Sequence, residues 1–258
     1  MTFDPEWLAL REQADAEARA DDLVELLRPT LEQEHLVIRD LGCGTGSMGR
    51  WLAPRLAAGQ HWVLHDHDSH LLELAAKSLL DLNVTVETCH GDIGRLRASD
   101  LTGTSLVTAS ALLDVLTLDE LNALATACVS SGVSTLLTLS VVGKVELDPV
   151  DPLDAAFQVA FNAHQRRVVD GRRLLGPDAV PAAVEAFGSL GAQVVTRPSP
   201  WRLGPDEAAL TQEWLQGWVG AACEQQPALY QDAPAYLRRR ADADLRVTVG
   251  HADLVAFV

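Results

Sequence analysis

The sequence predicts an α/β protein with a doubly wound, mostly parallel sheet of seven strands. Short apolar runs alternate along the chain with segments in which leucine and alanine recur at helical spacing. A glycine-rich turn follows the first apolar run, at Asp40-Leu41-Gly42-Cys43-Gly44-Thr45-Gly46. Strand, crossover helix and strand in repeated alternation imply a parallel sheet with helices on both faces.

The individual elements follow from apolar periodicity and from turn residues at their ends. The predicted helices span residues 5–28, 47–58, 69–80, 118–130 and 177–190. The predicted strands span residues 36–41, 61–65, 84–90, 106–109, 135–142 and 193–196. The chain closes with segments 245–248 and 254–258, which predict a hairpin-like ending around Gly250. We find no internal repeat and no low-complexity linker, so we expect residues 1–258 to form a single domain.

Composition narrows the classes of function. The chain of 258 residues has a net charge of −16, from 20 basic and 36 acidic residues. A surface this acidic repels phosphate backbones, so we expect a small-molecule substrate and no nucleic acid. No apolar run reaches the roughly 18 residues that span a bilayer, and the first residues do not resemble a secretion signal, so we expect no membrane association. The four cysteines are widely scattered, which favours a cytoplasmic location over a disulfide framework.

Three acidic residues stand at the ends of three successive predicted strands. Asp40 precedes the glycine turn, Asp66 lies twenty residues after Gly46, and Asp92 follows strand 84–90. A fold that binds a nucleoside places a carboxylate about 20 residues after the glycine turn, where it holds the ribose hydroxyls. The glycines let the backbone approach such a ligand closely.

This arrangement resembles the cofactor site of class I S-adenosylmethionine-dependent methyltransferases of the small-molecule type, in segment 40–46, in Asp66-His67-Asp68 and in His90-Gly91-Asp92-Ile93. The resemblance implies a Rossmann-like methyltransferase fold, S-adenosyl-L-methionine as cofactor and methyl transfer as the reaction. Asp66 is then expected on the ribose, Asp92 on the adenine amino group and Ser110 at the methionine end. The full set of core residues expected at the cofactor is Asp40, Gly42, Gly44, Gly46, Asp66, His67, Asp92, Ile93 and Ser110.

We expect the single domain to have four parts. Residues 35–142 are the cofactor-binding core, and residues 1–34 are a helical N-terminal lid. Residues 143–176 and 201–243 are two insertions that we expect on the substrate side.

One face of the predicted N-terminal helix carries Arg11, Asp15 and Arg19. Such a row is often a set of solvated ion pairs. Alternatively the helix covers the cofactor, with Arg11 or Arg19 on its methionine carboxylate.

Two other functions remain open at this stage. The run Gly44-Thr45-Gly46-Ser47-Met48-Gly49 is also a GxGxxG, so an NAD(P)-dependent Rossmann enzyme is one alternative, although Asp40 and Asp92 have no standard role there. A non-catalytic, methyltransferase-like binding subunit is the other. Four histidines cluster between positions 61 and 70, but they point in diverging directions and show no ligand spacing, so we expect no metal.

The insertion 143–176 carries the candidate acceptor residues. Four basic residues fall between positions 166 and 173, in a chain that is otherwise acidic. Either this segment is a helix with a solvated basic end, or it caps the acceptor, with Asn162, His164 and Arg166 on the substrate and His164 as general base. Asp114 is the alternative base. With such a cap, the acceptor is an O or N atom of a small, anionic metabolite.

The insertion 201–243 holds Trp201, Trp214 and Trp218, the last two one helical turn apart. Aromatic residues at this spacing are usual in a core or a dimer seam, and they also wall pockets for aromatic ligands. A homodimer through this segment is therefore a hypothesis.

Overall fold

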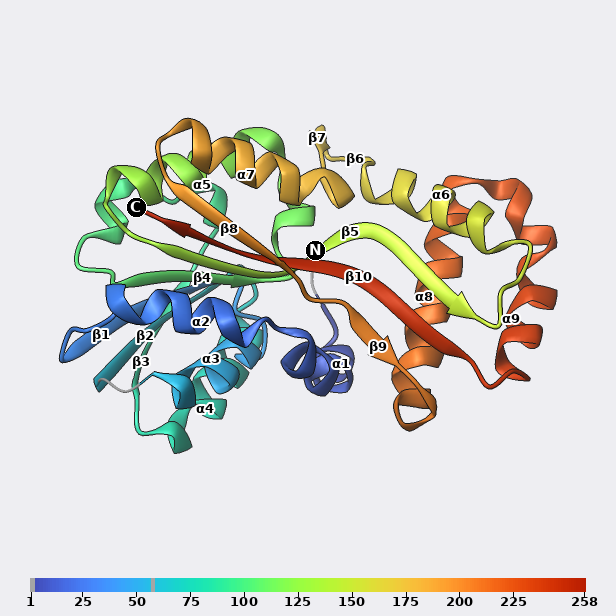
Figure 1. Cartoon of the computed structure of the whole chain (residues 1–258), viewed down its shortest axis with the longest axis horizontal. Helices are drawn as coiled ribbons and strands as arrows, with labels where there is room; N and C mark the ends of the chain where they lie inside the picture. The colour runs from blue at the N-terminus through green and yellow to red at the C-terminus, as the bar shows by residue number, and fades with distance from the viewer. Residues whose placement is uncertain (1–2, 57–58) are drawn as a thin grey trace.

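The computed structural model describes residues 3–56 and 59–258. Its centre is an eight-stranded sheet in the order β3-β2-β1-β4-β5-β10-β8, with β9 paired to β10 (Figure 1). The strands are β1 (His35–Leu41), β2 (Gly59–Asp66), β3 (Thr85–His90), β4 (Leu106–Ser110), β5 (Thr135–Asp148), β8 (Gln193–Pro198), β9 (Trp201–Leu203) and β10 (Arg246–Phe257). β1 to β5 are parallel, whereas β10 runs antiparallel to β5, β8 and β9. The predicted doubly wound, mostly parallel sheet is confirmed, with β9 as one strand more than predicted.

Helices cover both faces of the sheet, as the alternation of elements predicts. One core cluster packs α2, α3 and α4 on one face, and a second packs α5 and α7 on the other (Figure 1). The helices are α1 (Pro5–Ala18), α2 (Asp21–Leu27), α3 (Ser47–Leu52), α4 (Ser69–Ser78), α5 (Leu118–Ser130), α6 (Asp154–Gln165), α7 (Ala179–Ser189), α8 (Ala208–Gln225) and α9 (Ala233–Ala241). The last two residues of the predicted helix 47–58 lie outside the described residues.

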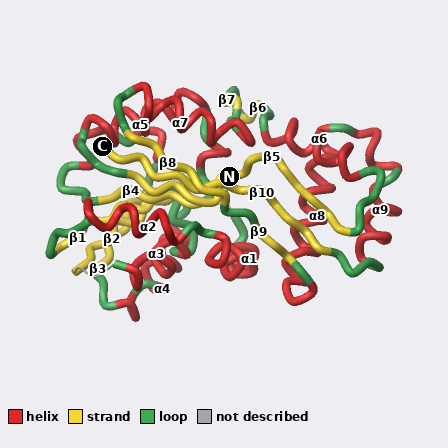
Figure 2. The backbone as a smooth tube through the Cα atoms, viewed as in Figure 1, coloured by secondary structure: helices red, strands yellow, loops and turns green. Residues whose placement is uncertain are grey.

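A third core cluster lies beyond the parallel strands. β5 and β10 continue there as a long antiparallel extension of the sheet, with β9 paired to β10, and α6, α8 and α9 gather on it (Figure 2). We call these three helices, together with β9, the insertion lobe. Its packing centres on aromatic rings that are at most 3% exposed, namely Phe157, Trp201, Trp218 and Tyr236. The lobe is therefore a packed extension of the fold with its own apolar centre.

The C-terminal end differs from the prediction, because β10 is a single strand and not a hairpin-like ending. Gly250 has a packing role there, since a Cβ at this position would lie 2.8 Å from Val142 Cγ2. The glycine therefore permits close approach of β5 and β10 and does not make a turn. β5 also runs to Asp148, past the predicted end at residue 142.

The N-terminal segment also differs, because the predicted helix 5–28 is two helices. Arg19 leaves the helical region, with φ −58° and ψ 138°. The next residue, Ala20, donates its N–H to the carboxylate of Asp253 in β10 at 2.9 Å. This bond to a buried strand satisfies a backbone donor at the break between α1 and α2.

Candidate active site

The glycine turn after β1 takes a backbone conformation that favours glycine. Gly42, Gly44 and Gly46 have φ of +63°, +54° and +89°. A Cβ at Gly46 would lie 2.8 Å from Ser78 Oγ and 3.2 Å from Ala75 Cα, so α4 leaves no room for a side chain. The turn can therefore bend sharply into α3 only with glycine at this position.

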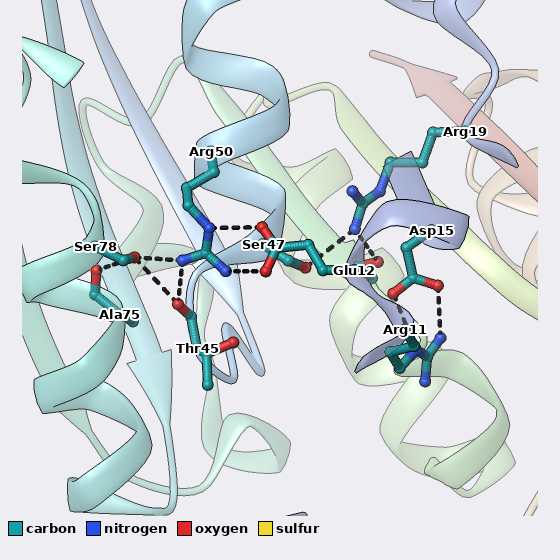
Figure 3. A network of polar contacts seen from close by, with 10 residues as sticks. Arg11, Glu12, Asp15, Arg19, Thr45, Ser47, Arg50, Ala75 and Ser78 are labelled. Carbon is teal, nitrogen blue, oxygen red and sulfur yellow. Dashed lines mark hydrogen bonds and ion pairs between the residues drawn. The ribbon is translucent and has the colours of Figure 1, made fainter. Parts of the chain in front are cut away.

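A polar network holds this turn between α1 and α4 (Figure 3). The Arg50 guanidinium donates to both carboxylate oxygens of Glu12, at 2.6 and 2.5 Å. It also donates to the Thr45 carbonyl and to Ser78 Oγ, both at 2.5 Å. The sequence did not predict a role for Glu12 and Arg50, because nothing in their spacing shows that α1 lies beside the glycine turn.

Asp66 ends β2 and faces the glycine turn. Its carboxylate accepts the N–H groups of Gly44 and Asp68, both at 3.0 Å, and His67 Nδ1 lies 3.2 Å from Oδ1. The side chain is only 6% exposed. Asp92, after β3, is exposed and accepts the Gly94 N–H at 2.9 Å. Each acid thus lies at the carboxyl end of its strand, as its position in the sequence predicts.

The turn and the acids border a cavity of about 440 Å³, which we call the glycine-loop cavity. Eight of the expected cofactor residues line it: Arg11, Gly42, Gly44, Asp66, His67, Asp92, Ile93 and Ser110. Leu112 lines it as well, beside Ser110, and further lining residues, which the sequence analysis missed, include Phe3, Leu8, Val115, Glu120 and Arg172. Arg172 arrives from a short hairpin, β6 (Val168–Val169) and β7 (Arg172–Arg173), and pairs with Glu120 at 2.7 Å.

A smaller space of about 50 Å³, the polar hollow, adjoins this cavity and shares Arg11, Gly42, Gly44 and Ser110 with it. Asp40 lines the polar hollow and is fully buried. Thr108 Oγ1 donates to Asp40 Oδ1 at 2.8 Å, while Oδ2 has no hydrogen-bond partner among the described residues. Burial raises the pKa of Asp40 to about 7.

The row on α1 is packed against the fold, so the interpretation as solvated ion pairs is wrong. The Arg11 guanidinium binds both oxygens of Asp15, at 2.9 and 3.0 Å, and these side chains are 13% and 7% exposed. Trp201 Nε1 also donates to Asp15, at 2.9 Å. Arg11 lines the glycine-loop cavity and the polar hollow, and its Nη1 has no hydrogen-bond partner within the described part of the chain.

Arg19 lies behind the polar hollow and does not line it. Its Nη2 donates to Ser47 Oγ at 3.2 Å (Figure 3) and to Ser110 Oγ at 3.0 Å. Both serines line the polar hollow. The guanidinium also lies 5.4 Å from the ring centroid of Trp51. Burial lowers the pKa of Arg19. The expectation of direct cofactor contact is thus replaced, for Arg19, by a position that orients two serines.

A second cavity of about 440 Å³, the aromatic cavity, adjoins the first and shares Phe3 and Val115 with it. Both candidate bases, Asp114 and His164, line it. Burial raises the pKa of Asp114 to about 6 and lowers the pKa of His164. Other lining residues are Trp7, Phe161, Gln165, Arg167, Leu174, Glu213, Trp214 and Trp218. Two residues far apart in sequence are therefore brought to one cavity.

The remaining predicted acceptor residues line neither cavity. Asn162 Nδ2 donates to the Gly143 carbonyl at 2.8 Å, which anchors α6 to β5. Arg166 pairs with Asp178 at 2.6 Å on the surface. The structure thus gives Asn162 and Arg166 roles in holding the insertion, and the expectation that they contact substrate finds no support in their placement.

Three further properties bear on function. The four cysteines are free. Among the described residues, no group of three or more His, Cys, Asp or Glu side chains could hold a metal ion. In the same residues, no helix is long and apolar enough to cross a membrane.

The strand order and the acids beside the glycine turn define the class: this is the fold of class I S-adenosylmethionine-dependent methyltransferases. Residues 38–131 match the family model described as "Methyltransferase domain". The predicted resemblance to class I methyltransferases is therefore confirmed. A comparison with curated proteins found no match.

Several solved structures share this fold. The YcgJ protein of Bacillus subtilis is 12% identical with a TM-score of 0.54, and the match covers 92% of this chain and 99% of that chain. The cyclopropane synthase MmaA2 of Mycobacterium tuberculosis is 15% identical with a TM-score of 0.52, covering 92% and 83%. The mycolic acid cyclopropane synthase CmaA1, solved with S-adenosylhomocysteine and CTAB, is 14% identical with a TM-score of 0.51, also covering 92% and 83%. Identities this low show a shared fold alone.

Proposed function

We propose that the protein transfers a methyl group from S-adenosylmethionine, bound in the glycine-loop cavity and the polar hollow, to an O or N atom of a small molecule in the aromatic cavity. The observation that carries this proposal is the adjacency of two cavities of different chemistry. One has glycine backbone and strand-end carboxylates, the other has two candidate bases, and Phe3 and Val115 border both.

The residues at the glycine-loop cavity fit the donor. Asp66 suits the ribose hydroxyls, and Asp92 and Ile93 suit the adenine ring. At the other end, Asp40 Oδ2 is a buried acceptor without a hydrogen-bond partner among the described residues, which suits the methionine ammonium group. Arg11 Nη1, which has no hydrogen-bond partner among the described residues, suits the methionine carboxylate. Opposite charges on the two ends of the amino-acid moiety thus have matching groups in the polar hollow.

The chemistry left to the chain is alignment and proton removal. The bound sulfonium supplies an activated methyl group. His164, whose pKa is lowered, is neutral at neutral pH and can accept a proton. Asp114, with a pKa of about 6, is mostly ionised there and can do the same. Alignment of the acceptor with the methyl group supplies most of the remaining rate enhancement.

The acceptor's anionic character stays a prediction: Arg167 lines the aromatic cavity, whereas two of the other arginines that suggested it are engaged elsewhere. Arg166 pairs with Asp178 and Arg172 pairs with Glu120. The three tryptophans proposed as a dimer interface, Trp201, Trp214 and Trp218, are at most 9% exposed within one chain. They are therefore not available for contact with a second copy. A homodimer through another surface, the absence of nucleic acid and a cytoplasmic location stay predictions.

The test is calorimetric titration of the full chain with S-adenosylmethionine, S-adenosylhomocysteine and NAD. We expect binding of the first two, with dissociation constants on the order of micromolar, and none of NAD. Asp66→Ala is expected to weaken S-adenosylhomocysteine by about 10- to 100-fold, because it removes charge-assisted hydrogen bonds. Binding of NAD alone selects the dinucleotide alternative, and binding of none selects the non-catalytic subunit.

Asp68→Ala is the matched control for this variant. Asp68 caps α4, where its carboxylate accepts the N–H groups of His70 and Leu71, and it lies outside the glycine-loop cavity. The control is expected to lower the free energy of unfolding by about 1 kcal/mol. Its affinity for S-adenosylhomocysteine is expected to stay within about threefold of the parent. Equal losses of affinity in both variants contradict a specific role for Asp66.

A further inference from the structure

The walls of the aromatic cavity come from segments far apart in the sequence. α1 supplies Trp7, α6 supplies Phe161, α8 supplies Trp214 and Trp218, and Phe3 precedes α1. The Trp214 and Trp218 rings are stacked with centroids 5.5 Å apart, and Phe161 lies 6.3 Å from Trp218. Aromatic faces gathered in this way attract a cation through their negative π faces.

The charged groups at this cavity have the matching sign. Asp114 and Glu213 line it, while Glu224 lies outside the lining, with a carboxylate oxygen 3.9 Å from His164 Nδ1. Arg167 is the one basic lining residue with a permanent charge among those described, and it donates to the His164 carbonyl at 3.0 Å. An anionic ligand would meet these carboxylates with a single cation to offset them, whereas a cationic ligand is attracted.

The unpartnered polar atoms at the cavity supply a further constraint. Gln165 Oε1 is a buried acceptor with no hydrogen-bond partner in the described residues, and Trp218 Nε1 is a buried donor in the same condition. An N–H or O–H group on a ligand would satisfy such an acceptor. An unpaired donor is satisfied by a hydroxyl or carbonyl oxygen elsewhere on the ligand.

We infer that the acceptor of this enzyme is a small amine, cationic in water, which enters the aromatic cavity through contacts with its rings and carboxylates. The inference rests on the proposed methyl transfer and specifies its acceptor. It selects nitrogen over oxygen and replaces the anionic metabolite expected from the basic cluster in the sequence.

The reaction balances with groups that the chain holds. The ammonium form of the acceptor first gives a proton to Asp114 or His164, which leaves a neutral amine with a lone pair. That lone pair forms the new N–C bond while the bond between the methyl carbon and sulfur breaks, and sulfur keeps the electron pair. The product is a methylated ammonium ion and S-adenosylhomocysteine, and the protonated base releases its proton to solvent.

The test uses three probes with the same ring and different charge: benzylamine, benzyl alcohol and phenylacetate. Each is titrated into the full chain saturated with S-adenosylhomocysteine, and saturation is itself measured first. We expect benzylamine to bind about tenfold more tightly than benzyl alcohol, and phenylacetate to bind most weakly.

Two variants sharpen the test. Trp7→Leu keeps an apolar wall and removes one π face, and Glu213→Gln removes one rim charge. Each is expected to lower the affinity for benzylamine about three- to fivefold, with the affinities for benzyl alcohol and S-adenosylhomocysteine changed by less than about twofold. Glu185→Gln on the exposed face of α7 is the matched control and is expected to change none of these affinities.

The outcomes separate the two proposals. If S-adenosylhomocysteine saturates the protein but benzylamine is not preferred, or no probe binds, the amine inference is overturned and the proposed methyl transfer stands. If S-adenosylhomocysteine does not bind, the proposed function fails and the inference fails with it. A preference for phenylacetate restores the anionic acceptor.

Discussion

The sheet core and the insertion lobe build their cavities in different ways. The glycine-loop cavity is formed largely by strand ends, by a backbone turn and by carboxylates placed next to them in sequence. The aromatic cavity is formed by side chains from α1, α6, α8 and the loop after β4. The donor side is therefore encoded locally, whereas the acceptor side exists only after distant segments have packed. Variants in each region test how far the two regions are independent.

Trp218→Ala is expected to have the largest effect on stability. Trp218 is 1% exposed, stacks on Trp214, and has its ring centroid 5.9 Å from that of Phe157. Its truncation is expected to lower the free energy of unfolding by about 3–5 kcal/mol, measured by urea unfolding. Since Trp218 lines only the aromatic cavity, the affinity of the folded variant for S-adenosylhomocysteine should stay within about threefold.

Trp62→Ala provides the contrast, because Trp62 is fully buried in β2 of the sheet core. This variant is expected to lower the free energy of unfolding by a similar amount. It is also expected to weaken the binding of S-adenosylhomocysteine, since β2 carries Asp66. Equal affinities for S-adenosylhomocysteine in the two variants would mean that donor binding does not depend more on the sheet core than on the insertion lobe.

Gly46→Ala is expected to have the next largest effect, and Gly103→Ala is its matched control. Both glycines have positive φ, +89° and +78°. A Cβ at Gly46 meets Ser78 and Leu79, while a Cβ at Gly103 meets nothing within 4 Å. We expect a loss of about 1 kcal/mol in the free energy of unfolding for Gly103→Ala and about 2–4 kcal/mol for Gly46→Ala. Only Gly46→Ala should weaken donor binding, which calorimetry measures.

Asp40→Asn tests the charge in the polar hollow through pH. The folded-state pKa of Asp40 is about 7, above the ordinary 3.8, so the folded state holds a proton that the unfolded state has lost. The free energy of unfolding should therefore fall as pH rises from about 4 through about 7. Asp40→Asn should remove this pH-dependent loss of stability. It should also weaken the binding of S-adenosylmethionine about tenfold at pH 8, where the parent carboxylate is ionised. Identical pH profiles for the parent and the variant contradict the assignment.

Glu12→Gln is expected to have a modest effect. Glu12 and Arg50 are 31% and 26% exposed, so the pair that ties α1 to the glycine turn is screened by solvent. We expect a loss of about 0.5–1 kcal/mol in the free energy of unfolding and about three- to fivefold weaker donor binding. Glu17→Gln on the exposed side of α1 is the control, expected to leave binding unchanged. Unchanged donor binding in Glu12→Gln would separate α1 from the donor site.

Arg166→Ala is expected to have the smallest effect. Its surface pair with Asp178 contributes at most about 0.5 kcal/mol to the free energy of unfolding. The affinities for S-adenosylhomocysteine and benzylamine should not change, because Arg166 lines neither cavity. A loss of acceptor affinity in this variant would restore the substrate contact expected from the sequence.

The parts of the fold that sequence reasoning predicted are those with a local cause. Apolar periodicity and strand-to-helix turns placed β1 to β5 and their crossovers. The predicted hairpin-like ending around Gly250 is wrong. In a sequence, a glycine that permits close approach of a neighbouring strand looks the same as a glycine that makes a turn. The predicted single helix 5–28 is wrong for a similar reason. The break after α1 at Arg19 depends on the hydrogen bond from Ala20 to Asp253 in β10, which local sequence does not reveal.

The sequence by itself determined the fold class and the donor side of the site. Glycine conformation and the order of strands are local properties, and parallel strands bring Asp40, Asp66 and Asp92 to one edge whatever the rest of the chain does. Only the tertiary structure decided the acceptor side. The meeting of Trp7, Asp114, His164 and Trp218 depends on how α1, α6 and α8 pack around the antiparallel extension of β5 and β10. Packing between segments more than 200 residues apart produces no periodic pattern in the sequence, so residue spacing could not predict it.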